Sequence, residues 1–107
     1  MKTLLTTLCL SLTLLLGSIG MSESADQGYV VKTFSGCDYF IADGTRGLYV
    51  LEWYGGYDPS EGDTIIGDIG SYGMKDVTYN NSRSGRVWVE DFLESSDAAM
   101  EEINDHC

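Results

Sequence analysis

The sequence predicts a mainly β fold, a small antiparallel β-barrel of about five to six short strands with one C-terminal α-helix. Segments rich in β-branched and aromatic residues recur about every ten residues, and turns containing glycine separate them. Only the segment from Ser95 onward has the apolar spacing of a helix. The part of the chain predicted to fold, residues 25–107, is long enough for a single small domain.

Residues 1–24 have the three parts of a secretory signal peptide. Lys2 precedes an apolar run from Leu4 to Leu16, and small residues follow this run as far as Ser24. The run is shorter than the roughly 20 apolar residues that a membrane-spanning helix needs. We expect removal of residues 1–24, with cleavage after Gly20 as the alternative, and a secreted or periplasmic protein without a transmembrane segment.

Six segments are predicted to be strands. The dipeptides Ser35–Gly36, Asp43–Gly44 and Gly55–Gly56 mark the first turns between them. Gly67, inside an apolar segment, predicts a bend. The predicted strands are residues 28–34, 38–43, 48–54, 63–69, 74–79 and 86–92. In architecture alone, this pattern resembles small barrels of the OB or SH3-like size class. It differs from the OB arrangement in the position of the helix, which lies between the third and fourth strands in OB barrels but follows all the strands here.

The C-terminal segment predicts a helix over residues 95–106. Ser95 is a good N-cap residue, and acidic residues follow it in the first turns, where they favour helix formation. Met100, Ile103 and Cys107 fall on one face at helical spacing. We expect the helix to pack by this face as a lid on one end of the barrel.

Two cysteines remain after removal of the signal peptide, Cys37 and Cys107. Exported proteins fold in an oxidising compartment, and small exported domains are commonly stabilised by disulfides. We therefore expect a Cys37–Cys107 bond that closes most of the domain into one loop. The alternatives are a free thiol or a bridge between two chains.

The expected core is aromatic and aliphatic. One step in register would turn every side chain of a strand to the other face, so the inward set depends on the pairing. The expected core residues are Tyr29, Phe34, Phe40, Leu51, Trp53 and Val87, with Ile65 or Ile66 according to register.

The net charge disfavours two classes of partner, nucleic acid and anionic lipid. The chain has a formal charge of −11, and removal of residues 1–24 leaves it unchanged because one lysine and one glutamate are lost together. A field of this sign repels nucleic acid and anionic lipid. Proteins or glycans remain possible partners, above all cationic ones, and we expect a monomer.

Catalysis finds little support in the sequence. His106, the single histidine, lies at the helix end, where a solvated residue is expected, and adjacent helical residues such as Cys107 do not face it. Glu52 lies mid-strand between Leu51 and Trp53, where alternation predicts an outward-facing residue. We expect no enzyme, no catalytic residue and no cofactor.

Cation binding is the alternative function. Asp58, Glu61 and Asp63 offer three carboxylates on a short loop, a ligand type that suits Ca²⁺, although their spacing differs from that of the EF-hand calcium loop. Pro59 and Gly62 favour a different interpretation, an ordinary turn between two strands. No zinc site is expected, because such sites generally use more Cys and His than remain here.

Surface recognition is the leading functional prediction. Tyr54, Tyr57 and Tyr72 lie in glycine-containing connections, and tyrosine in a loop is a common contact residue for proteins and sugars. The alternative is that these rings fold over the barrel and complete its core. The sequence therefore predicts a non-catalytic binding module with these tyrosines as its contact residues.

Overall fold

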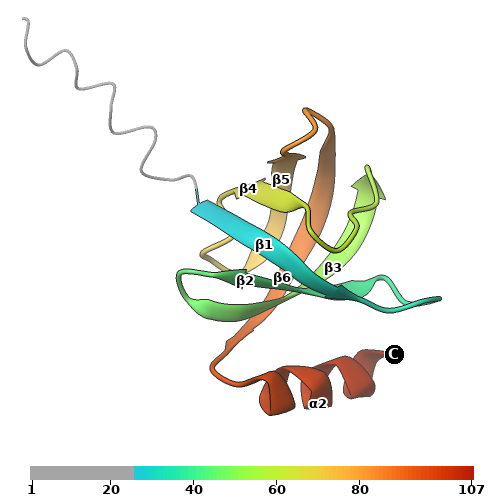
Figure 1. Cartoon of the computed structure of the whole chain (residues 1–107), viewed down its shortest axis with the longest axis vertical. Helices are drawn as coiled ribbons and strands as arrows, with labels where there is room; N and C mark the ends of the chain where they lie inside the picture. Colours follow the sequence, from blue (N-terminus) through green and yellow to red (C-terminus); the bar gives the residue numbers. More distant parts are fainter. Residues whose placement is uncertain (1–25) are drawn as a thin grey trace, which may run out of the picture.

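The computed structural model describes residues 26–107, which form a closed antiparallel barrel of six strands followed by one helix (Figure 1). The strands follow one another around the barrel in the order β1–β2–β3–β6–β5–β4, and β4 pairs with β1 to close it. The elements are β1 (Asp26–Thr33), β2 (Tyr39–Gly44), β3 (Gly47–Gly56), β4 (Thr64–Gly67), β5 (Gly73–Tyr79), β6 (Ser84–Leu93) and α2 (Ser96–His106). The predicted signal peptide, residues 1–24, lies outside the described residues.

The predicted barrel and its six strands are thus confirmed, and the bounds of β3 and β4 differ from the predicted ones. β3 continues through Gly55 to Gly56, past the predicted turn, and the pairing with β6 is irregular between Trp53 and Gly55. Gly56 has a φ of 78°, and a Cβ there would lie 2.5 Å from the Cα of Gly85. Glycine at both positions lets the two strands approach closely at this point. β4 is shorter than predicted and ends at Gly67.

The interior of the barrel holds most of the predicted core. Phe40, Leu51 and Val87 are buried there, and the register selects Ile65, not Ile66. Trp53 is half-buried and packs against this cluster. The main cluster consists of Val30, Phe40, Ala42, Tyr49, Leu51, Ile65, Ile69, Val77, Tyr79, Val87 and Val89.

The prediction for Tyr29 is wrong. Its side chain is 54% exposed, whereas that of the next residue, Val30, is fully buried. Because side chains alternate along a strand, β1 can turn only one of these neighbours inward. The smaller β-branched residue occupies the interior position.

Helix α2 packs on the outside of the barrel wall, so the prediction of a lid on one end is wrong. Ile41 and Val50 pair across β2 and β3 and point away from the interior, and Ala99 and Ile103 of the helix bury them in a second cluster. Phe34, predicted for the barrel interior, packs against this second cluster. Figure 1 shows α2 crossing beside β2, β3 and β6. The barrel therefore carries an apolar surface on both sides of the β2–β3 pair.

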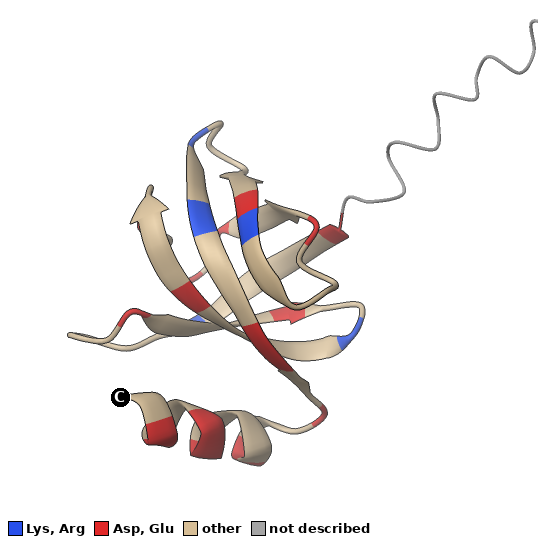
Figure 2. Ribbon diagram, turned by 180° about the vertical axis from the view of Figure 1, so that it is seen from behind, with Lys and Arg blue, Asp and Glu red and all other residues tan. Residues whose placement is uncertain are grey.

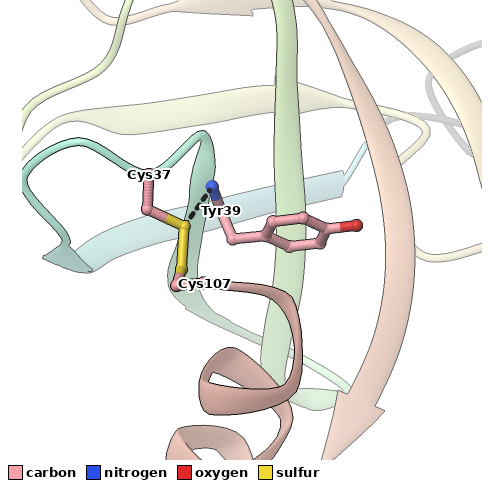
Figure 3. The surroundings of a disulfide bond; sticks show 3 residues. All are labelled: Cys37, Tyr39 and Cys107. Atoms are coloured by element: carbon pink, nitrogen blue, oxygen red, sulfur yellow. Dashed lines mark hydrogen bonds between the residues drawn. A yellow bond between two sulfur atoms is a disulfide. The ribbon is translucent and has the colours of Figure 1, made fainter.

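The start and the end of α2 follow the prediction. The Ser95 hydroxyl accepts a hydrogen bond from the amide of Ala98, as an N-cap residue does. At the other end, Cys107 forms a disulfide with Cys37, with the two Cα atoms 5.8 Å apart, and the amide of Tyr39 donates to the Cys37 sulfur (Figure 3). Within residues 26–107, no helix is both long and apolar enough to cross a membrane.

Candidate functional site

An open groove of about 740 Å³ lies on the outer surface of the barrel, where β3, β6, β5 and β4 run side by side. Tyr54 at its edge is 53% exposed. Arg86 and Asp76 pair across β6 and β5 and form an ion pair of 2.9 Å. We call this surface the groove face; it is lined by Tyr54, Gly55, Gly56, Ile66, Gly67, Asp76, Val77, Thr78, Ser84, Gly85 and Arg86.

Glycines give the groove face its shape. A Cβ at Gly67 would lie 2.9 Å from a side-chain carbon of Val77, and a Cβ at Gly85 would lie 2.8 Å from the carbonyl oxygen of Gly55. The main chains of neighbouring strands therefore come close at these glycines. A ligand in the groove would meet the glycine main chain together with side chains such as Tyr54, Arg86 and Asp76.

An exposed apolar pair extends the groove face along the same two strands. Trp88 and Met74 pair across β6 and β5 two residues beyond Arg86 and Asp76, and both are partly exposed. Residues two apart in a strand share a face, so this pair lies on the same side of the barrel as the groove. The alternation of Trp88 with Val87 and Val89 in the sequence indicates that Trp88 faces outward. The predicted contact residues were instead the tyrosines in the loops, so Trp88 was missed.

The three predicted contact tyrosines do not form one surface. Tyr54 lines the groove, whereas Tyr72, also exposed, lies against Phe92 near the other end of β6. Tyr57 packs against the core with its ring edge on Tyr79. Its hydroxyl donates to Asp63 at 2.8 Å, and this hydrogen bond, followed by burial, raises the pKa of Tyr57.

In the predicted cation loop, two of the three carboxylates accept hydrogen bonds from other residues of the domain. Asp63 accepts hydrogen bonds from the Tyr57 hydroxyl and from the amide of Ser60, and Glu61 accepts one from the amide of Thr33. Asp58 is exposed. Among residues 26–107, these three carboxylates do not gather into a group that could hold one ion. Calcium binding by this loop stays a prediction, and the turn interpretation explains the contacts.

A different group of ligand-type side chains lies between α2 and β6. Glu90, Glu102 and His106 each offer an atom, and these atoms all lie within 4.8 Å of one another. The His106 ring stacks on Tyr39, with ring centroids 4.3 Å apart and an angle of 15° between the planes. His106 is exposed at the helix end, as expected, and the stacking on Tyr39 orients its ring.

Glu52 lies on the outer surface between two aromatic residues, as the alternation predicted. It pairs with Tyr39 on one side and with Trp88 on the other. Burial, and then the Glu52 carboxylate beside the phenol, raise the pKa of Tyr39 above its ordinary value. Glu52 does not line the groove.

Charge is unevenly distributed over the barrel. Figure 2 shows acidic positions along α2 and on the strands near it, whereas basic positions on β5 and β6 lie toward the opposite end. Lys75 and Arg86 are the basic residues of these two strands, and α2 carries four acids (Asp97, Glu101, Glu102 and Asp105). The helix end is therefore the side of the barrel that favours cations.

No protein-family model matches the chain, and neither a curated protein nor a solved structure matches it.

Proposed function

We propose that the protein is an exported, non-catalytic binding module and that the groove face, with Tyr54 at its edge, is its contact surface. The open groove of about 740 Å³ beside an exposed tyrosine is the observation that carries this proposal. Concave surfaces that combine aromatic rings with a few polar groups are typical of ligand sites. Trp88 and Met74 enlarge the apolar area available to a partner.

The chemistry of the groove suits a chain-like ligand, a polypeptide segment or a glycan. Tyrosine offers an apolar ring face with a polar tip, which fits both peptides and sugars. The hydroxyl groups of Thr78 and Ser84 add donors and acceptors along the groove, and the Arg86–Asp76 pair adds both signs of charge. The net charge of −11 favours neutral or cationic ligands over anionic ones.

The lining residues support binding in preference to catalysis. Nucleophilic catalysis needs a nucleophile with a base beside it. The hydroxyl groups of the groove belong to Tyr54, Thr78 and Ser84, whereas the carboxylate of Asp76 is engaged by Arg86. His106 and Glu52 lie outside the groove.

Export is supported by two independent features. The N-terminal segment has signal-peptide character, and the disulfide joins residues 70 positions apart, as expected of a small domain that folds in an oxidising compartment. N-terminal sequencing of the protein recovered from the periplasm or medium tests this proposal. A mature chain beginning at Ala25, or at Met21 under the alternative cleavage, supports export, and an intact chain retained in the cytoplasm contradicts it.

The binding proposal is tested by screening the purified protein on peptide and glycan arrays. Tyr54→Ala should lose at least tenfold in affinity for a ligand bound by the wild type, since removal of an aromatic contact that binds the ligand costs about 1.4 kcal/mol or more. Tyr29→Ala is the matched control, because Tyr29 has the same exposure but lies on β1 outside the groove. Equal binding by wild type and Tyr54→Ala would sink the proposal. Tyr57 is unsuitable for this test because it is part of the packing.

A further inference from the structure

We propose that Glu90, Glu102 and His106 form a binding site for one divalent transition-metal ion such as Zn²⁺, at the contact between α2 and β6. This site is separate from the groove face, which lies toward the other end of β6. The prediction of no zinc site rests on the number of cysteines and histidines alone. The fold brings two carboxylates to the single histidine.

The spacing of the donor atoms fits a shared ion. The His106 Nε2 atom lies 3.4 Å from Glu102 Oε2 and 3.7 Å from Glu90 Oε2. Donors that each lie about 2.0–2.2 Å from one ion are roughly 3–4 Å apart. The three side chains can therefore coordinate an ion with small side-chain movements and no shift of α2 against the barrel.

Neighbouring residues hold two of the ligands in position. The Trp88 indole N–H donates to Glu90 Oε1 at 2.9 Å, which leaves Oε2 as the oxygen nearer to His106. The stacked Tyr39 ring fixes the plane of the imidazole. The disulfide at Cys107 anchors the chain directly after His106. Such outer contacts orient metal ligands and commonly change metal affinity by about 10–100-fold.

The donor types select the class of ion. An imidazole nitrogen suits Zn²⁺, Cu²⁺ and Ni²⁺, whereas Ca²⁺ and Mg²⁺ prefer sites made entirely of oxygen. Glu102 and His106 are four residues apart on one helix face, so a single helical turn presents both to the ion. The acidic surface around α2 favours the approach of a cation.

The test is a calorimetric titration of the tag-free protein with ZnCl₂, after treatment with a chelator and with the disulfide shown intact by a thiol assay. We expect one ion per chain with a dissociation constant of about micromolar or lower. Glu90→Gln and Glu102→Gln should each weaken binding roughly tenfold or more, because each removes a charged ligand but keeps the size of the side chain. Trp88→Phe should weaken binding about tenfold, and less than either glutamate variant, since it removes only the hydrogen bond that orients Glu90.

Glu101→Gln is the matched control, because it removes the same charge from the adjacent, exposed position of α2. This variant should bind Zn²⁺ as the wild type does. Thermal melts in chelator establish that each variant is folded, and the melting temperature of wild type should rise with Zn²⁺ but not with an equal concentration of Ca²⁺.

The proposal is overturned if wild type binds no Zn²⁺, or if Glu101→Gln and Glu102→Gln weaken binding equally, which would indicate general attraction by the acidic surface. A response to Ca²⁺ that Asp63→Asn abolishes, with no response to Zn²⁺, would place the cation in the loop at residues 58–63 instead.

Discussion

Tyr49 and Tyr79 lie in the same buried core, but their hydroxyl groups differ in hydrogen bonding. The Tyr49 hydroxyl donates to Asp26 at 2.8 Å and accepts from the amide of Arg46 at 3.1 Å. The Tyr79 hydroxyl is buried and has no hydrogen-bond partner within residues 26–107. A buried polar group that lacks a partner costs free energy, whereas a paired one stabilises the fold. The two residues therefore predict opposite effects for the same substitution.

Tyr49→Phe should lower the free energy of unfolding by about 1–3 kcal/mol. The variant keeps the ring in the core, where its edge-to-face contact with Phe92 remains. It loses a hydrogen bond to a carboxylate and leaves the Arg46 amide without this acceptor, and bonds to charged groups contribute the most. Chemical denaturation monitored by circular dichroism gives the change directly. A loss below a few tenths of a kcal/mol would mean that Asp26 does not hold this hydroxyl in solution.

Tyr79→Phe should leave the free energy of unfolding unchanged or raise it by up to about 1 kcal/mol. The substitution removes an unpaired hydroxyl from the core and retains the ring against Tyr57. The same denaturation experiment measures it, with Tyr49→Phe as the comparison. Destabilisation as large as that of Tyr49→Phe would show that the Tyr79 hydroxyl has a partner in solution.

Replacement of both cysteines by serine should lower the free energy of unfolding by roughly 4 kcal/mol. The bond closes a loop of 70 residues, and its removal restores that loop's entropy to the unfolded chain. α2 has 11 residues, too few for a stable helix in isolation, so loss of helical signal should accompany the change. Denaturation with and without reductant gives the same quantity for the wild type. Two titratable thiols in the denatured, unreduced mature protein would contradict the bond itself.

The elements of this fold could be predicted from the sequence because each depends on local chemistry. Turn dipeptides such as Asp43–Gly44 and the N-cap residue Ser95 act over a few residues. Register depends instead on which strands pair, so Tyr29 could not be told from Val30 as the inward residue of β1. The position of α2 on the barrel could not be predicted either. Helix α2 covers Ile41 and Val50 on the outer surface, and in the sequence these two residues are typical of any strand.

The candidate sites depend even more on tertiary contacts. Tyr54 was recognisable from its place beside glycines, but the groove exists only because β4, β5 and β6 come together beside it. The group of Glu90, Glu102 and His106 joins a strand to the helix that begins after two connecting residues, and Glu102 and His106 lie 12 and 16 residues after Glu90 in the sequence. Each of these side chains alone is ordinary for its position. Their combination became visible only when the direction of α2 along the barrel was known.

Stability should fall as the pH rises above about 10, the ordinary pKa of tyrosine. Burial raises the pKa of Tyr79 and of Tyr39 in the folded protein, with Asp58 and Glu52 respectively adding to the effect. The folded state therefore favours the neutral phenols, and the unfolded chain releases these protons first. The neutral Tyr39 and Tyr79 phenols therefore contribute to the free energy of unfolding. This contribution is complete below the pKa that tyrosine has in the unfolded chain, and it is lost as the pH rises through the pKa values of the folded protein. Urea denaturation between about pH 8 and 11, with tyrosinate absorbance as a second probe, measures this dependence. The Tyr39→Phe/Tyr79→Phe double variant should show a shallower decline, and an identical decline in both proteins would refute the assignment to these two residues.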